Sequence, residues 1–243
     1  MKAMILAAGL GTRLRPLTDD RPKALVEVAG RTMLEITLSR LRSWDVRDVI
    51  INLHYFADQV IAYLQANNNF GMHIEVSCEE ILLDTGGGLK KAAHFFQSAP
   101  GDPEEPFILH NVDVVSDIDL RRMGQFHVEK RALATLAVQN RQTSRYLLFD
   151  DHFQLCGRQS KNQNELVRRS PSLQPLAFTG IHIISPRLLT MLTEEAAFSI
   201  ISSYLRLAAQ GEKILSFRAD QYYWRDLGRP ESIQQAVQEV DRF

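Results

Sequence analysis

Short apolar runs alternate with amphipathic helical segments through the first half of this chain, and this pattern strongly limits the possible folds. The apolar runs that read as strands are 2–7, 48–53, 73–78 and 106–111, and the segments with helical spacing are 32–43, 57–66, 88–97 and 120–130. Such alternation favours a parallel sheet with helices on both faces, in which ligands bind beyond the carboxyl ends of the strands. Gly9, the 79–88 loop and Asp113 fall at those ends.

The second half of the chain has a different pattern. Its apolar runs at 132–139, 146–149, 153–156 and 176–184 are joined by turns rather than by helical segments, which predicts an antiparallel extension of the sheet. We then expect helices at 186–192 and 199–210, with Ser199 as an N-cap, a final strand pair at 213–217 and 222–226, and a last helix near Pro230. The predicted fold class is α/β, a Rossmann-like mixed, mostly parallel sheet flanked by helices.

The loop after the first strand concentrates glycines and basic side chains. Gly9 and Gly11 permit close backbone approach, Arg13 offers planar multidentate contacts, and Lys23 is a compact charge. This arrangement suits binding of a polyphosphate by backbone N–H groups and fixed cations. Leu14 stands where a dinucleotide-binding fingerprint needs its third glycine, and no Walker A motif is present. Taken alone, G-x-G fits a βα turn with a solvated basic rim equally well.

The longer segment L-A-A-G-L-G-T-R-L-R-P-L-T-D-D-R-P-K-A-L-V-E-V-A-G, residues 6–30, resembles the opening of the sugar-1-phosphate nucleotidyltransferases. In size and loop sequence the chain is most similar to short single-domain members, such as the N-acetylmuramate 1-phosphate uridylyltransferases and heptose 1-phosphate guanylyltransferases. The resemblance implies the nucleotide-diphospho-sugar transferase fold and Mg²⁺-dependent transfer of NMP from an NTP to a sugar 1-phosphate, with release of pyrophosphate. It also implies catalytic roles for Arg13 and Lys23, and nucleotide contacts from Ala8, Gly9, Gly11, Thr12 and Arg13.

Two aspartates are the candidate metal ligands. Asp113 ends the H-N-V-D segment after an apolar strand, where a carboxylate can hold Mg²⁺ against phosphate oxygens, although the residue alone is more simply a turn cap. The resemblance implies that Asp113 is a catalytic metal ligand and that Asp226, in D-L-G-R-P-E, is its partner. Asp226 could otherwise cap the last helix or pair with Arg225. Val112 replaces the glycine usual in the family, and we expect its side chain to narrow the space beside the sugar.

The segment C-E-E-I-L-L-D-T-G-G-G-L-K-K-A, residues 78–92, resembles the base-recognition loop of the family. The resemblance implies nucleotide contacts from Glu80, Gly86 and Gly87. Glycines opening a helix let the backbone approach a flat base, and a carboxylate can accept hydrogen bonds from base N–H groups, but a simple tight turn explains the same glycines. A glutamate suits guanine, whereas D-T-G-G-G resembles the uridylyl enzymes, so the base stays open with UTP slightly preferred over GTP.

The sequence motifs for binding the acceptor sugar 1-phosphate are weaker than those for the nucleotide. The resemblance implies sugar contacts from Asn111, Thr179 and Gly180. We expect four further polar residues to lie near the same pocket, namely Arg141, Ser144, Arg145 and Tyr146. Many family members carry a lysine that touches the sugar phosphate in an E-K-P segment, and Lys161 is the one weak candidate for that role.

Length, composition and charge fit one catalytic domain over residues 1–243, with a nucleotide-binding part at about 1–130 and a sugar-binding part at about 131–243. A net charge of −1 argues against a nucleic-acid partner, and no apolar run approaches the roughly 20 residues of a membrane span. Two cysteines, Cys78 and Cys156, form no disulfide framework, which suits the cytoplasm. We expect a monomer or small homo-oligomer that makes nucleotide-sugars for cell-envelope carbohydrate.

A protein of the same fold could instead bind a nucleotide-sugar as a regulatory subunit without turnover. The presence of Arg13, Lys23, Asp113 and Asp226 together argues against this alternative, because binding a base does not require the complete charge cluster.

Overall fold

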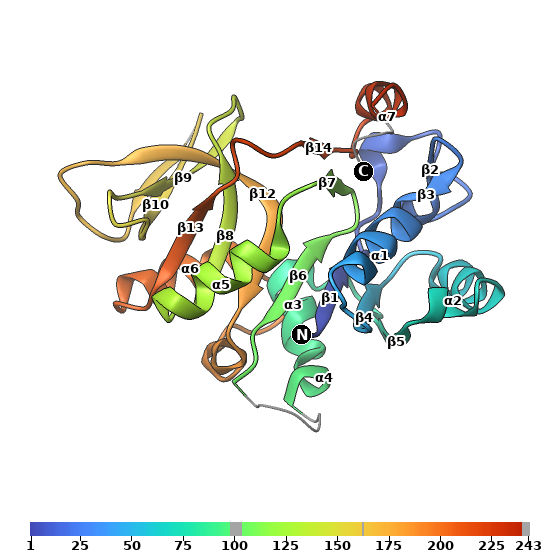
Figure 1. The fold of residues 1–243 in the computed structure, drawn as a ribbon, viewed down its shortest axis with the longest axis horizontal. Coiled ribbons are helices and arrows are strands. Elements are labelled where there is room, and N and C mark those ends of the chain that lie inside the picture. Colours follow the sequence, from blue (N-terminus) through green and yellow to red (C-terminus); the bar gives the residue numbers. More distant parts are fainter. Residues whose placement is uncertain (98–103, 162, 240–243) are drawn as a thin grey trace.

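The computed structural model describes residues 1–97, 104–161 and 163–239. Its centre is a mixed sheet with the strand order β11-β10-β9-β12-β6-β1-β4-β5, in which β8 also pairs with β12 and β13 pairs with β8 (Figure 1). Helices cover both faces of the sheet (Figure 1). The predicted α/β architecture with a mixed sheet flanked by helices is therefore confirmed.

Four neighbouring strands form the parallel part of the sheet. β1 (Ala3–Leu6) lies between β4 (Asp48–Leu53) and β6 (Phe107–Asn111), and β5 (His73–Cys78) lies beyond β4. All four run in the same direction, so their carboxyl ends meet at one edge of the sheet. The loops that carry the candidate site residues leave from this edge.

The second half of the chain forms the expected antiparallel extension, on the left of Figure 1. β12 runs antiparallel to β6, β8 and β9, while β10 pairs antiparallel with β9 and β11. β13 pairs in parallel with β8. The bounds are β8 (Ala134–Gln139), β9 (Arg145–Phe149), β10 (Leu155–Ser160), β11 (Gln163–Leu166), β12 (Gln174–Ile184) and β13 (Ile214–Arg218).

The predicted final strand pair is wrong in its pairing. β14 (Trp224–Asp226) does not lie beside β13 but pairs antiparallel with β7 (Val114–Ser116), a strand that sequence patterns did not indicate. The chain changes direction between the two strands, where the Gln139 side chain donates to the carbonyls of Ala219 and Tyr222. This turn carries residues 224–226 away from β13 and across to the segment that follows β6.

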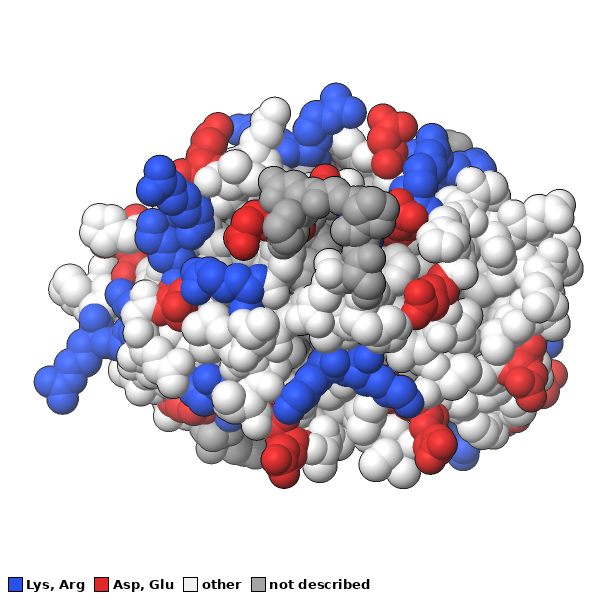
Figure 2. Space-filling model, turned by 90° about the horizontal axis from the view of Figure 1, so that it is seen from below, with Lys and Arg blue, Asp and Glu red and all other residues white. Residues whose placement is uncertain are grey.

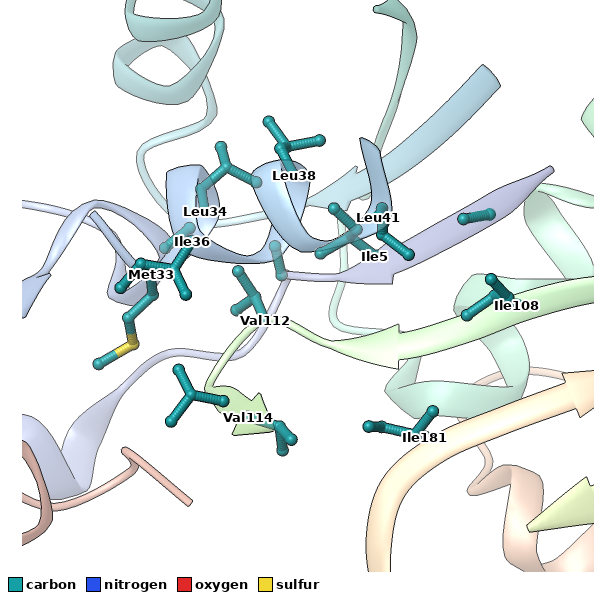
Figure 3. Packing of buried hydrophobic residues seen from close by; sticks show 14 of the residues in the cluster. Ile5, Met33, Leu34, Ile36, Leu38, Leu41, Ile108, Val112, Val114 and Ile181 are labelled. Carbon is teal, nitrogen blue, oxygen red and sulfur yellow. The ribbon is translucent and has the colours of Figure 1, made fainter. Parts of the chain in front are cut away.

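The two faces of the sheet pack two separate apolar cores. Along β1, Ala3 and Ile5 face the first core, and Met4 and Leu6 face the second, as the alternation of side chains in a strand requires. In Figure 3 the apolar side of the helix that begins at Met33 lies over Ile5 and Val112. The helices of the first core are α1 (Met33–Ser43), α2 (Ala57–Ala66), α5 (Leu120–Lys130) and α7 (Pro230–Val237), and those of the second are α3 (Asp84–Lys91), α4 (Ala93–Gln97), α6 (Ile200–Ala209) and the 3₁₀ helix η4 (Pro186–Met191).

Polar side chains cap the starts of three helices, and the predicted N-cap at Ser199 is confirmed. The Thr32 hydroxyl accepts from the Glu35 N–H, the Asp119 carboxylate from the Arg122 N–H, and the Ser199 hydroxyl from the Ile201 N–H. No helix within the described residues is long and apolar enough to cross a membrane. Short elements complete the fold: η1 (Thr12–Leu14), η2 (Lys23–Leu25), η3 (Asn68–Gly71), β2 (Glu27–Val28) and β3 (Arg31–Thr32).

Helix α3 begins at Asp84, four residues before the predicted start at residue 88. The glycines at 86 and 87 therefore lie inside the helix, although glycine is a poor helix former. The segment before α6 compensates, because the Phe198 carbonyl accepts from the N–H groups of Gly86 and Gly87 at 2.9 and 3.3 Å. A Cβ atom on Gly86 would lie 2.3 Å from the Phe198 ring. Tertiary packing thus overrides the local preference.

We expect Gly86→Ala to destabilise the fold by about 1–3 kcal/mol, because the added methyl group overpacks the contact with Phe198. Gly124→Ala is the matched control. A Cβ atom on Gly124, inside α5, would meet only the Met1 and Ile183 side chains at 3.5 and 3.8 Å, so alanine there should stabilise by about 0.5–1 kcal/mol. Urea unfolding of both variants measures the difference, and a stabilised Gly86→Ala variant would contradict the packing described.

Candidate active site

An ion pair between Lys23 and Asp113 lies beyond the carboxyl end of the parallel strands. Asp113 follows β6 by two residues, and Lys23 opens η2 in the loop after β1. The Lys23 Nζ donates to Asp113 Oδ2 at 2.9 Å, and the two side chains are only 14% and 9% exposed. Two of the predicted catalytic residues, 90 positions apart in sequence, are therefore in direct contact.

Asp226 joins this pair through the β7–β14 ladder. The ladder places Asp226 opposite Val114, and the Leu227 N–H donates to the Asp113 carbonyl at 2.8 Å. The Asp226 carboxylate accepts from the Gly228 N–H at 2.8 Å, which fixes its direction. The two predicted metal ligands thus lie on adjacent backbone segments.

The donor set at Asp113 and Asp226 fits Mg²⁺, which is commonly held by one or two carboxylates together with substrate phosphates and water. Within the described parts of the chain, no group of three or more His, Cys, Asp or Glu side chains could hold a metal ion by itself. A cation at the two aspartates would therefore complete its coordination with oxygens from the substrates.

Arg13 reaches the same place from the first loop. A Cβ atom on Gly228 would lie 2.8 Å from both the Arg13 Nη2 and the Asp226 Oδ1. Gly11 adopts a left-handed conformation with φ +66° and sits against Thr18, whose hydroxyl donates to the Gly11 carbonyl at 2.9 Å. The loop is thereby folded back, and it directs Arg13 toward the residues that follow β14.

The predicted phosphate-binding residues differ in exposure. Ala8 is buried, Gly11 is partly exposed, and Gly9, Thr12 and Arg13 are exposed. A Cβ atom on Gly9 would lie 3.5 Å from the Lys23 Nζ, so the backbone at Gly9 runs beside the lysine. The structure therefore brings exposed backbone and two cationic side chains together, and the contacts of these residues with a nucleotide stay a prediction.

A buried hydrogen-bond chain, missed in the sequence, supports the loop that leads into α3. The Ala7 N–H donates to Asn52 Oδ1 at 2.8 Å, Asn52 Nδ2 donates to Glu79 Oε1 at 2.7 Å, and the Leu83 N–H donates to Glu79 Oε2 at 2.9 Å. Asn52 and Glu79 are both buried. The signal that could have found them is Asn52 itself, a polar residue near the carboxyl end of the apolar strand D-V-I-I-N-L.

The three predicted base contacts occupy different surroundings. Glu80 is exposed, whereas its neighbour Glu79 is buried and bonded to the segment that leads into α3. Gly86 and Gly87 are buried, and the close approach that they permit is to Phe198 and Ala196. The predicted contacts of Glu80, Gly86 and Gly87 with a base stay predictions.

The predicted sugar contacts come together only in part. Gly180 has a φ of +84°, and a Cβ atom there would lie 2.7 Å from Asn111 Nδ2, so these two residues are neighbours. Thr179 is 1% exposed, and its hydroxyl donates to the Ala137 carbonyl at 2.8 Å. The structure therefore directs the Thr179 hydroxyl into the sheet.

Two further expectations concern Val112 and Lys161. The expected narrowing of the sugar space by Val112 is wrong, because its side chain is fully buried in the first core beneath α1 (Figure 3). Lys161 is exposed in the turn between β10 and β11. β11 is the outer strand of the sheet, with β10, β9 and β12 between it and β6.

The sequence model of the nucleotidyl transferase family matches residues 2–242 of this chain. This chain belongs to the nucleotidyl transferase family. It is 35% identical over 241 residues to the N-acetylmuramate alpha-1-phosphate uridylyltransferase of Caulobacter vibrioides, covering 95% of this chain and 93% of that protein. The UTP–glucose-1-phosphate uridylyltransferase of Synechocystis sp. is 28% identical, and the match covers 99% of this chain but 63% of that longer protein.

Solved structures share the fold of this nucleotidyl transferase. HddC from Yersinia pseudotuberculosis, complexed with GMP-PN, superposes with a TM-score of 0.77 at 22% identity, covering 98% of this chain and 99% of HddC. A putative glucose-1-phosphate thymidylyltransferase from Bacillus anthracis gives a TM-score of 0.82 at 17% identity. The resemblance carried by residues 6–30 is confirmed, and the chain is an enzyme of the sugar-1-phosphate nucleotidyltransferase class.

The buried chain through Glu79 yields a prediction about stability. Glu79→Gln should destabilise the fold by about 1–3 kcal/mol, because the new amide must face one of two donors, the Asn52 side chain or the Leu83 N–H, with its own NH₂ group. Glu80→Gln removes the same charge from an exposed position and should change stability by less than about 0.5 kcal/mol. Equal urea midpoints for the two variants would rule out the supporting role of Glu79.

Proposed function

We propose that this enzyme transfers UMP from UTP to the phosphate of N-acetylmuramate α-1-phosphate, forming the UDP-sugar and releasing pyrophosphate. The observation that carries the proposal is the 35% identity to the Caulobacter vibrioides uridylyltransferase across nearly the whole of both chains. The contact of Lys23 with Asp113, and the approach of Arg13 to Asp226, support a reaction between two phosphate-bearing substrates.

The reaction requires mainly positioning and charge stabilisation. A phosphate oxygen of the acceptor attacks the α-phosphorus of UTP in line, and the bond from that phosphorus to the leaving pyrophosphate breaks. Arg13 binds the β- and γ-phosphates as negative charge builds up on them, and Lys23 neutralises the attacking phosphate and the α-phosphate. The attacking oxygen is already ionised, so no side chain has to act as a general base.

Asp113 and Asp226 are the residues that would hold Mg²⁺. When bound, the ion supplies positive charge that offsets the negative charge of the reacting phosphates. Lys23 contacts the same Asp113 carboxylate at 2.9 Å, so it keeps this carboxylate directed toward the loop where the nucleotide phosphates are proposed to lie.

We also propose that the two parts of the single domain bind different substrates. Residues up to about 130 bind the nucleotide, with Glu80, Gly86 and Gly87 near the base. Residues from about 131 onward bind the sugar through Thr179 and Gly180, and Asn111 from the first part also contacts the sugar. We further propose a cytoplasmic location and a monomer or small homo-oligomer. The absence of a nucleic-acid partner is supported by the net charge of −1 and by basic and acidic side chains that are interspersed on the face shown in Figure 2.

A substrate panel tests this function. Pyrophosphate release is measured with each of the four common NTPs against N-acetylmuramate, N-acetylglucosamine, glucose, mannose and heptose 1-phosphates. We expect the highest kcat/KM for UTP with N-acetylmuramate 1-phosphate. A preference for GTP would overturn the proposed base, and binding of a nucleotide-sugar without turnover in any combination would favour the regulatory alternative.

The proposed metal ligands give a mutational prediction. Asp113→Asn and Asp226→Asn should each lower kcat by about 10²–10³-fold or more, because each removes a charge that would hold Mg²⁺ against the substrates. Asp45→Asn is the control, since Asp45 is an exposed residue paired with Arg47 on the surface. Circular dichroism should show folded protein for all three variants, and near-normal Mg²⁺-dependent turnover in both site variants would exclude the paired-ligand arrangement.

A further inference from the structure

Arg141 is held in an unusual position beside the site. It follows β8, and its Nη2 donates to the Phe178 carbonyl at 2.9 Å. The guanidinium carbon lies 3.8 Å from the centre of the Trp224 ring. Arginine stacked on tryptophan in this way is stabilised by the negative face of the ring.

The guanidinium has donors that the protein does not use. The Arg141 Nε is buried and has no hydrogen-bond partner among the described residues. More than nine in ten buried polar groups in proteins are hydrogen-bonded, so the unpaired Nε shows that contacts within the protein do not satisfy this guanidinium completely. Burial lowers the pKa of Arg141, and the nearby Asp226 carboxylate partly offsets this effect.

Trp224 fixes the arginine relative to the predicted metal ligand. The indole Nε1 donates to the Thr179 carbonyl at 2.7 Å, and Trp224 pairs with Ser116 in the β7–β14 ladder. Asp226 lies two residues further along the same strand. The stack therefore holds a desolvated positive charge near the carboxylate where the reacting phosphates are proposed to meet.

We propose that Arg141 binds the 1-phosphate of the acceptor sugar. This assignment rests on the proposed transfer to a sugar 1-phosphate. A guanidinium carries five N–H donors in a planar fork that matches phosphate oxygens, and within the described chain Arg141 forms no ion pair that already occupies them. The phosphate accepts from the unused donors, which orients its attacking oxygen while Trp224 covers the face of the guanidinium.

Binding beside Trp224 can be followed by fluorescence, because the chain has two tryptophans and Trp44→Phe leaves Trp224 as the sole tryptophan, which can be excited selectively at long wavelength. In this background, fluorescence and calorimetric titrations use UTP, N-acetylmuramate 1-phosphate and N-acetylglucosamine 1-phosphate. Arg141→Gln should raise the Kd of both sugar phosphates by about 10–100-fold, as expected for loss of charge-assisted hydrogen bonds, and leave the Kd of UTP within about twofold. Arg141→Lys, which keeps the charge but not the fork, should lie between wild type and Arg141→Gln.

Arg158→Gln is the matched control, because Arg158 is paired with Glu165 in the β10–β11 hairpin and should change no Kd. An effect of Arg141→Gln below threefold, or equal weakening of UTP, would overturn the assignment. A weaker affinity of Arg141→Gln for N-acetylmuramate 1-phosphate alone would also overturn the assignment, since Arg141 would then bind the carboxylate of that sugar. If the wild type binds sugar phosphates through Arg141 but shows no turnover, the proposed function is wrong and the assignment of Arg141 stands.

Discussion

The short antiparallel ladder between β7 and β14 is the constraint on which the site depends. It consists of three residue pairs, yet it brings the residues around 226 to the loop that follows β6, across more than a hundred positions of sequence. The bond from the Leu227 N–H to the Asp113 carbonyl extends the ladder by one step. This contact fixes the position of Asp226 and the residues around it relative to Asp113 and Lys23.

The charges at the site are arranged at an energetic cost. Removing Lys23 and Asp113 from water is unfavourable, and a largely buried pair of this kind contributes little net stability. The pair is better understood as a way of setting positions, because each group directs the other. The folded state is stabilised mainly by contacts between uncharged side chains, notably the packing of the apolar side of α1 against the sheet (Figure 3).

Much of the fold was predictable because its signals are local. The bounds of β4, α2, β5 and α5 agree with the sequence patterns residue by residue, since each has a clear apolar period and a clear end. The pairing of β14 with β7 was not predictable, because both strands have only three residues and their partners are distant. The start of α3 was also missed, since its glycines are helical only through their contact with Phe198.

As for the fold, part of the candidate site was predictable from local sequence signals, and the rest depends on contacts between distant residues. Sequence reasoning nominated Lys23, Asp113 and Asp226 from three separate segments that each resemble the family, and the structure brings these residues to one place. It nominated Glu80 and gave no role to the buried Glu79, since which of two consecutive side chains is buried depends on the hydrogen bonds around Asn52. The direction of the Thr179 hydroxyl likewise depends on β8, which lies beside β12 only after folding.

The packing of Phe198 on Gly86 has a consequence for how this protein can diverge. The two residues share one volume, with a ring on one side and a missing methyl group on the other. If evolution replaces Gly86 by a larger residue, the new side chain clashes with the Phe198 ring unless position 198 changes to a smaller residue. Positions 86 and 198 should then vary together among descendants of this chain, although more than a hundred residues separate them and one belongs to each half of the fold.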